Sequence, residues 1–268
     1  MSIFFEEDNE GRLDIVIGTM FSGKTSYILG QIAKLAELNY KILYINIEFD
    51  TRSINTFSTH NPFFDNHVDF IKKESISKNV TMIKSKTLND LDVNVYSVII
   101  VDEAHFFDDI VEFTNKCLEN KKFIIVAGLQ ADFKGNKFGK INDLIPINTN
   151  ITRLHAYCSE CALNRKCRIA IYSKRITKSK RINDIGGSDK YIPVCREHYT
   201  ETLMENKVKI DKISDKIDKI SDKSEKSEKS EKSEKPSELQ QKNTDEIKNI
   251  KEIDNTDIKE VTMSTTNK

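Results

Sequence analysis

The stretch LDIVIGTMFSGKTSYILGQIAKLAEL, residues 13–38, joins an apolar run to a helical pattern through a loop that contains two glycines. Its first part, LDIVIG (13–18), predicts a buried strand, and YILGQIAKLAEL (27–38) predicts a helix. Between them, GTMFSGKT (18–25) matches the phosphate-binding pattern G-x-x-x-x-G-K-[ST] in the strand–loop–helix context that this pattern requires. The stretch therefore predicts a nucleoside triphosphate site.

The residue types of this loop suit phosphate chemistry. Gly18 and Gly23 let the backbone turn tightly, so that successive N–H groups and the positive end of the helix converge on a phosphate. Lys24 would reach the β- and γ-phosphates of ATP, and the Thr25 hydroxyl would bind Mg²⁺. The alternative is a glycine turn that only caps a helix. The predicted nucleotide-binding loop consists of Gly18, Thr19, Met20, Phe21, Ser22, Gly23, Lys24 and Thr25.

The following residues repeat the alternation of strands and helices. Further strands are predicted at KILYINI (41–47), VTMI (80–83), VYSVIIV (95–101) and KKFIIVAG (121–128), with a helix around DIVEFTNKCLEN (109–120). Short, nearly continuous apolar strands separated by helices indicate a parallel sheet covered on both faces. The predicted fold class is α/β, a P-loop NTPase-like parallel sheet flanked by helices.

Two consecutive acids end one of these strands, in VIIVDE (98–103). Asp102 is placed at the carboxyl edge of the sheet, where it can hold the Mg²⁺ shell, and Glu103 can accept a proton from the attacking nucleophile. Alternatively, both acids only cap the next helix.

The same region spells DEAH (102–105), the letters of a class of nucleic-acid helicases. Such motors need a second α/β domain, whereas the predicted sheet-forming region ends near residue 150. We therefore interpret the four letters as coincidental.

A four-ligand metal pattern follows the predicted sheet. CSEC supplies Cys158 and Cys161, and CREH supplies Cys195 and His198. Two such pairs can close a tetrahedral structural Zn²⁺ site with no open position for catalysis. Cys167 is a competing ligand, and Cys117 is predicted to be a core residue. The alternative is a set of buried free thiols.

Composition sets the boundaries and excludes some function classes. The 268 residues have a formal net charge of zero, which does not indicate nucleic-acid binding, and they contain no apolar run near the roughly 20 residues that span a bilayer. The N-terminus does not resemble a signal peptide, and the cysteine pattern suits a reducing cytoplasm. The predicted domains are a nucleotide-binding domain (1–150), a zinc-binding lasso (151–204) and a charged, disordered tail (205–268). A short coiled coil is the alternative for the tail, from Ile210, Ile213, Ile217 and Ile220.

The motifs together resemble one family, the zinc-containing thymidine kinases of the cellular and poxvirus type, over most of residues 12–200. The matching segments are GTMFSGKT, FDTRS, FSTH, DEAHFF, GLQADFKGNKFG, CSEC, YSKR, IGGSDKY and CREHY, in the family's order. The sequence departs from the usual pattern at Thr19 for proline, His105 for glutamine, Gln130 for aspartate and Lys137 for proline.

The resemblance implies a kinase that transfers the γ-phosphate of ATP to the 5′-hydroxyl of thymidine or deoxyuridine. It implies that Glu103 is the general base and that Asp50, Arg52 and His105 lie near the nucleotide with Asp102. It also implies a homotetramer and inhibition by deoxythymidine triphosphate. The implied nucleoside-binding residues are Met20, Phe106, Leu129, Phe133, Phe138, Ser173, Ile185, Gly186, Gly187 and Tyr191. The alternatives are a nucleic-acid-dependent motor and a nucleotide-binding module with weakened catalysis.

Overall fold

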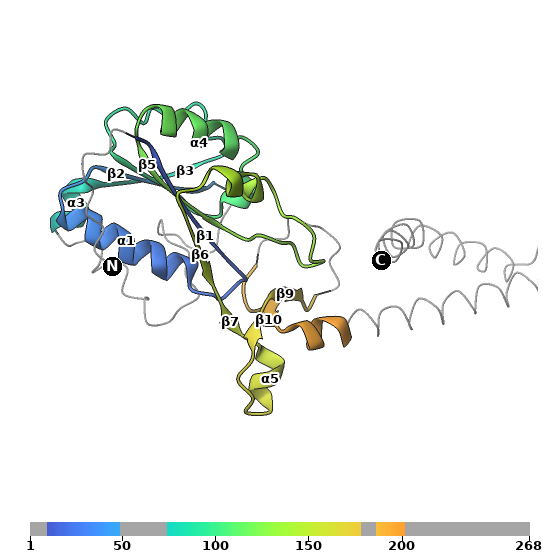
Figure 1. The fold of residues 1–268 in the computed structure, drawn as a ribbon. Coiled ribbons are helices and arrows are strands. Elements are labelled where there is room, and N and C mark those ends of the chain that lie inside the picture. The colour runs from blue at the N-terminus through green and yellow to red at the C-terminus, as the bar shows by residue number, and fades with distance from the viewer. Residues whose placement is uncertain (1–9, 49–73, 178–185, 202–268) are drawn as a thin grey trace, which may run out of the picture. The chain divides into compact units, whose positions relative to one another are not determined.

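The computed structural model describes residues 10–48, 74–177 and 186–201. Its centre is a six-stranded sheet in the order β3-β2-β4-β5-β1-β6, and every neighbouring pair is parallel (Figure 1). The strands are β1 (Arg12–Gly18), β2 (Ile42–Ile47), β3 (Val80–Ser85), β4 (Val98–Val101), β5 (Phe123–Gly128) and β6 (Asn150–Leu154). The predicted fold class is confirmed.

Helices cover both faces of this sheet. Helix α1 (Lys24–Glu37) packs on one face and α4 (Ile110–Glu119) on the other. The short helix α3 (Glu74–Asn79) contacts α1. Strand β1 shows how one strand serves both layers: Leu13 and Ile15 belong to the core under α4, whereas Val16 belongs to the core under α1. Because both faces are covered, the central strands are buried along nearly their whole length.

Two predictions about the sheet were wrong. The strand expected at residues 95–101 begins only at Val98, because Val95 is 72% exposed and lies outside the sheet. The sheet also has a sixth strand that was not predicted, β6, which pairs with β1 from Asn150 to Leu154. β6 was missed because most of its residues are exposed at the edge of the sheet, so it lacks the apolar run that marked the other strands.

Short strands and helices follow the sheet and carry further residues of the predicted site. Two antiparallel pairs follow the sheet, one between β7 and β8 and one between β9 and β10. The strands of these pairs are β7 (Ala156–Tyr157), β8 (Ile169–Ala170), β9 (Tyr172–Arg175) and β10 (Tyr191–Val194). The remaining described helices are α5 (Ser159–Leu163) and the 3₁₀ helices η2 (Ala104–Phe106) and η3 (Ile141–Ile147). Tyr172 and Tyr199 stack with ring centroids 4.0 Å apart and help to close this part of the core.

Some predictions fall outside the described residues. The tail 205–268 and its isoleucine series do so, and the division at residues 150 and 204 stays a prediction. Within the described part of the chain, no helix combines the length and the apolar character that crossing a bilayer requires.

Candidate active site and metal centre

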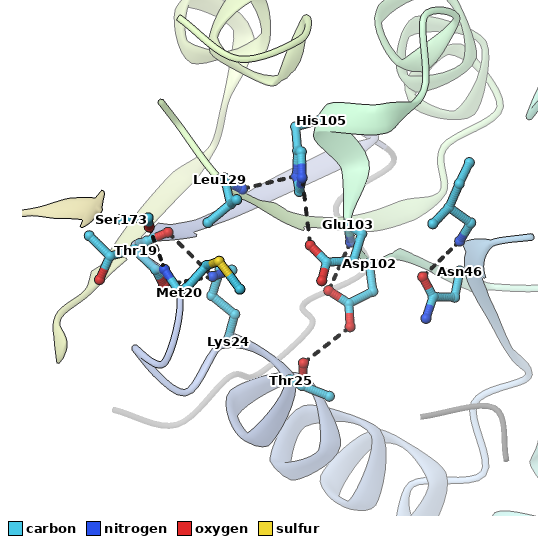
Figure 2. A network of polar contacts seen from close by, with 12 residues as sticks. Thr19, Met20, Lys24, Thr25, Asn46, Asp102, Glu103, His105, Leu129 and Ser173 are labelled. Atoms are coloured by element: carbon cyan, nitrogen blue, oxygen red, sulfur yellow. Dashed lines mark hydrogen bonds and ion pairs between the residues drawn. The ribbon is translucent and has the colours of Figure 1, made fainter. Parts of the chain in front are cut away.

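The phosphate-binding loop connects β1 to α1 and has the backbone that its glycines predict. Gly23 adopts φ 86°, a conformation that residues with a Cβ rarely take. A Cβ at Gly18 would lie 2.6 Å from the carbonyl oxygen of Leu154, so β6 approaches the loop too closely for a larger residue. The buried Lys24 points back into the loop, where its Nζ donates to the carbonyl oxygens of Thr19 at 2.9 Å and Gly18 at 3.3 Å (Figure 2).

The polar atoms of this loop fit a phosphate group. The hydroxyls of Thr19 and Ser22 are buried, and among the described residues neither has a hydrogen-bond partner. A buried polar group without a partner is costly, and an anion at the N-terminus of α1 would supply acceptors for both hydroxyls and for the Lys24 ammonium. The Lys24 ammonium and these two hydroxyls thus all belong to the loop between β1 and α1 that the sequence predicted for the triphosphate.

Asp102 follows β4 and lies opposite the start of α1. Its carboxylate accepts hydrogen bonds from the Glu103 N–H at 2.9 Å and from the Thr25 hydroxyl at 3.4 Å (Figure 2). It also accepts one from the Tyr44 hydroxyl at 3.0 Å. Burial, followed by repulsion from the Glu103 carboxylate, raises the pKa of Asp102 to about 6. An aspartate and a threonine hydroxyl in contact are the protein ligands that Mg²⁺ takes beside a P-loop, so both residues fit this ion.

Glu103 has a left-handed backbone, with φ 52° and ψ 37°, at the start of η2. This conformation is strained for a residue with a side chain, and such strain of about 1–3 kcal/mol concentrates at functional sites. The Glu103 side chain is 16% exposed, and its Oε2 lies 3.8 Å from Nε2 of His105. Asp102 and Glu103 therefore differ in their surroundings: Asp102 is buried beside Thr25, whereas the Glu103 side chain is partly exposed.

An aromatic cluster borders Glu103. The rings of Phe106 and Phe138 meet edge to face with centroids 5.6 Å apart, and both contact the ring of His105. The backbone N–H of Leu129, which follows β5, donates to Nδ1 of His105. Three predicted base-binding residues are thus brought together. His105, which was predicted near the nucleotide, lies against Glu103 and Leu129 (Figure 2).

A second group of predicted residues reaches the site from β9 and β10. Ser173 is buried, and its hydroxyl accepts a 3.0 Å hydrogen bond from the Met20 N–H, which ties β9 to the phosphate-binding loop. Arg175, which the sequence did not single out, lies 3.8 Å above the Phe133 ring and donates to the Tyr191 hydroxyl at 3.2 Å. The lasso residues Gly186 and Gly187 precede β10, whereas Asp50, Arg52 and Ile185 lie outside the described residues.

The four predicted metal ligands form one cluster. Nδ1 of His198 lies 3.3 Å from Sγ of Cys158, 3.5 Å from Sγ of Cys161 and 3.4 Å from Sγ of Cys195. A tetrahedral zinc ion with bonds of about 2.3 Å to sulfur and 2.0 Å to nitrogen places its ligands about 3.5–3.8 Å apart, so the cluster fits Zn²⁺. Cys167 is exposed and is not part of it.

The thiols of the cluster differ in pKa: burial raises the pKa of Cys161 to about 11, whereas the pKa values of Cys158 and Cys195 are lowered. In Cys195 burial works to raise the pKa, but hydrogen bonds from the backbone and side chain of His198 outweigh it and lower the pKa to about 7. Cys117 lies in the core under α4, and burial raises its pKa to about 12. The first is suited to bind metal as a thiolate, and the second is an inert structural residue, as the sequence predicted.

Sequence comparison decides the family. The family profile described as thymidine kinase matches residues 11–199. The thymidine kinase of fowlpox virus is 36% identical over 193 residues, covering 70% of this chain and 97% of that protein. The cytosolic thymidine kinases of Bos taurus and Homo sapiens are 32% and 34% identical, covering 77% and 70% of this chain and 79% and 73% of those proteins.

The chain belongs to the thymidine kinase family. The nucleic-acid motor and the weakened nucleotide-binding module are not favoured by this finding. For a thymidine kinase, the site contains, besides Arg175, a further polar residue that sequence reasoning missed. Tyr44 is completely buried and bonds to Asp102 from the adjacent strand. The sequence did contain a signal for it, because Tyr44 and Asn46 alternate with Ile45 and Ile47 near the carboxyl end of β2.

Proposed function

We propose that the chain transfers the γ-phosphate of ATP to the 5′-hydroxyl of thymidine or deoxyuridine, which gives the 5′-monophosphate and ADP. The observation that supports this most is the placement of Glu103. Its carboxylate lies between a metal-binding pair, Asp102 and Thr25, and an aromatic cluster that suits a nucleoside base. A carboxylate at this position can act as the general base: it can accept the proton of a hydroxyl while the oxygen of the same hydroxyl attacks the phosphate.

The chain's own groups have separate tasks in this mechanism. When ATP binds, the Lys24 ammonium donates to phosphate oxygens in place of the carbonyl oxygens of Gly18 and Thr19. The N–H groups of the loop bind the same phosphate. Thr25 and Asp102 hold Mg²⁺, which neutralises phosphate charge when it is bound. Glu103 takes the proton of the 5′-hydroxyl. Arg52, with Asp50, belongs to the same proposal as a group that stabilises the transferring phosphoryl.

The nucleoside is held by residues on both sides of Glu103. The predicted set is Met20, Phe106, Leu129, Phe133, Phe138, Ser173, Ile185, Gly186, Gly187 and Tyr191. The hydrogen bond between Met20 and Ser173 supports it, because it joins the phosphate-binding loop to the strand pair β9–β10 of the predicted zinc-binding lasso. The Cys₃His cluster holds structural zinc at the base of the same strand pair. A homotetramer, inhibition by deoxythymidine triphosphate and a cytoplasmic location are parts of this proposal that rest on the resemblance.

The test offers acceptors from both candidate classes to the purified chain. ATP and Mg²⁺ are supplied with thymidine, deoxyuridine, deoxycytidine or a single-stranded oligonucleotide, and ADP and nucleoside monophosphate are quantified by chromatography. We expect equal amounts of ADP and monophosphate with thymidine or deoxyuridine, and loss of both products in Lys24→Ala. ADP that forms only with the oligonucleotide contradicts the proposal.

A further inference from the structure

We propose that His105 is a positioning residue, whose imidazole fixes the Glu103 carboxylate and connects it to the pocket for the nucleoside base. The inference rests on the proposed function, because it takes Glu103 as the base of the phosphoryl transfer. It concerns a position where the family motif usually has glutamine, and it assigns the histidine a defined task.

Packing fixes the place of the imidazole. Only 1% of the His105 side chain is exposed, and its ring centroid lies 4.2 Å from that of Phe106 and 4.5 Å from that of Phe138. Two glycines make room for the residue. A Cβ at Gly128 would lie 2.9 Å from Nδ1 of His105, and a Cβ at Gly139 would lie 2.0 Å from its carbonyl oxygen. The ring is therefore packed between two aromatic rings, and Nδ1 and the backbone of His105 lie where only glycine fits opposite them.

A hydrogen bond then fixes the direction of the ring and its tautomer. The backbone N–H of Leu129 donates to Nδ1 of His105 at 3.1 Å. Accepting this bond requires a lone pair on Nδ1, so the proton of the neutral imidazole is carried by Nε2. Nε2 lies 3.8 Å from Oε2 of Glu103 (Figure 2). The donor thus faces the carboxylate, at a distance that tightens in catalytic sites when substrate binds.

A neutral donor is suited to a carboxylate that acts as a base. A nearby cation would favour the charged form of Glu103 and weaken its tendency to take a proton. The Nε2–H of neutral His105 can orient the same carboxylate without adding a positive charge. Glutamine offers the same pair of functions, because its amide has one acceptor for Leu129 and one donor for Glu103.

The contacts of His105 also lead into the pocket. Leu129, Phe106 and Phe138 are all predicted to contact the nucleoside base, and all three touch or bond to His105. A nucleoside base that binds against these three residues would therefore also fix the position of the imidazole that orients Glu103. The expected consequence is an effect on kcat rather than on the KM for ATP, because the contacts of His105 lead to Glu103 and to the predicted base-binding residues.

The experiment compares His105→Leu and His105→Gln, each in the wild-type chain and in Glu103→Gln. Misplacing a catalytic group by about 1 Å costs about 100-fold in rate. We therefore expect His105→Leu to lower kcat about 10- to 100-fold at an unchanged KM for ATP, and His105→Gln to recover most of it. In the Glu103→Gln background His105→Leu should cost less than about threefold further, because its effect passes through Glu103.

The outcomes separate the possibilities. Unchanged kcat in His105→Leu overturns the inference and leaves the proposed function intact. An equal loss in both backgrounds also overturns it, since a purely structural residue behaves in that way. If the wild-type chain does not phosphorylate thymidine, the proposed function fails and the inference fails with it. If His105→Leu does not fold, His105→Asn replaces it, because its shorter amide cannot reach both Leu129 and Glu103.

Discussion

The hydroxyl of Tyr44, on β2, donates a 3.0 Å hydrogen bond to the carboxylate of Asp102, at the end of the neighbouring β4. Tyr44 is completely buried and Asp102 is 2% exposed, so water does not replace this bond. An ionised carboxylate in such a place needs donors, and Tyr44, Thr25 and the Glu103 N–H supply them. The sheet thus provides part of the environment that keeps a metal-binding group charged.

Tyr44→Phe tests this relationship. Removing a hydrogen bond to a charged group costs about 1.5–3 kcal/mol, so the free energy of unfolding should fall by about this amount at pH 8. The loss should be smaller at pH 5, because Asp102, with a pKa of about 6, is then mostly protonated. Urea unfolding at both pH values measures the difference. Tyr157→Phe is the control, since Tyr157 is 66% exposed. Equal losses at the two pH values would contradict the account.

Asp102→Asn should separate stability from function. The folded state raises the pKa of Asp102 from 3.8 to about 6, so it binds this proton more tightly than the unfolded chain does. The ionised carboxylate therefore lowers stability above about pH 6, and this penalty disappears as the pH falls through 6 to below 3.8.

Without added metal, we expect Asp102→Asn to raise the free energy of unfolding at pH 8 by about 1–3 kcal/mol, with the gain vanishing near pH 4. The same variant should lose Mg²⁺-dependent turnover. Denaturant titrations across this pH range decide the matter. A variant that is less stable than the wild type at pH 8 would show that Asp102 stabilises the fold as an anion.

Thiol reactivity tests the zinc centre. In the zinc-loaded native chain, only the exposed Cys167 should react with a thiol reagent. A strong chelator should release Cys158, Cys161 and Cys195 as well, and Cys117 should react only in denaturant because it is buried with a pKa of about 12. The expected counts are therefore one, four and five of the five cysteines. Cys167→Ser should lower each count by one. Four reactive thiols before chelation would mean that the cluster holds no metal.

The fold was predictable wherever a strand was buried on both faces. LDIVIG and FIIVAG are almost wholly apolar because β1 and β5 lie at the centre of the sheet, and the composition alone marked them as strands. The edge strand β6, with the sequence NITRL, has no such run, and its pairing with β1 depends on contacts across more than a hundred residues. Val95 showed the opposite error, since an apolar residue outside the sheet extended the predicted strand.

The candidate site also has a part that could be predicted from the sequence and a part that could not. Lys24 and Cys158 belong to local motifs with fixed spacing, and their chemistry could be inferred from a few consecutive residues. The hydrogen bond from Tyr44 to Asp102 could not, because Tyr44 reaches Asp102 from another strand and belongs to no motif, and the bond from the Leu129 N–H to His105 could not, because it joins two motifs that are separate in the sequence. Which residue orients a catalytic group is decided by tertiary packing, which sequence spacing does not encode.

Glu103→Gln tests the central claim most directly, that Glu103 is the base of a phosphoryl transfer to a nucleoside hydroxyl. The change keeps the shape of the side chain and removes the proton acceptor, so the Kd for ATP should stay within about twofold. Losing a positioned base costs about 10²–10⁴-fold in rate, or about 3–5 kcal/mol of barrier. Asp108→Asn is the control, because Asp108 is an exposed acid near the site.

The measurement is kcat for ADP and for thymidine monophosphate, determined together for the wild type and for Glu103→Gln. The account predicts that wild-type ADP formation requires thymidine and equals monophosphate formation, and that both fall together by at least about 100-fold in the variant. Wild-type turnover in Glu103→Gln, or ADP formation that does not depend on thymidine, would contradict it.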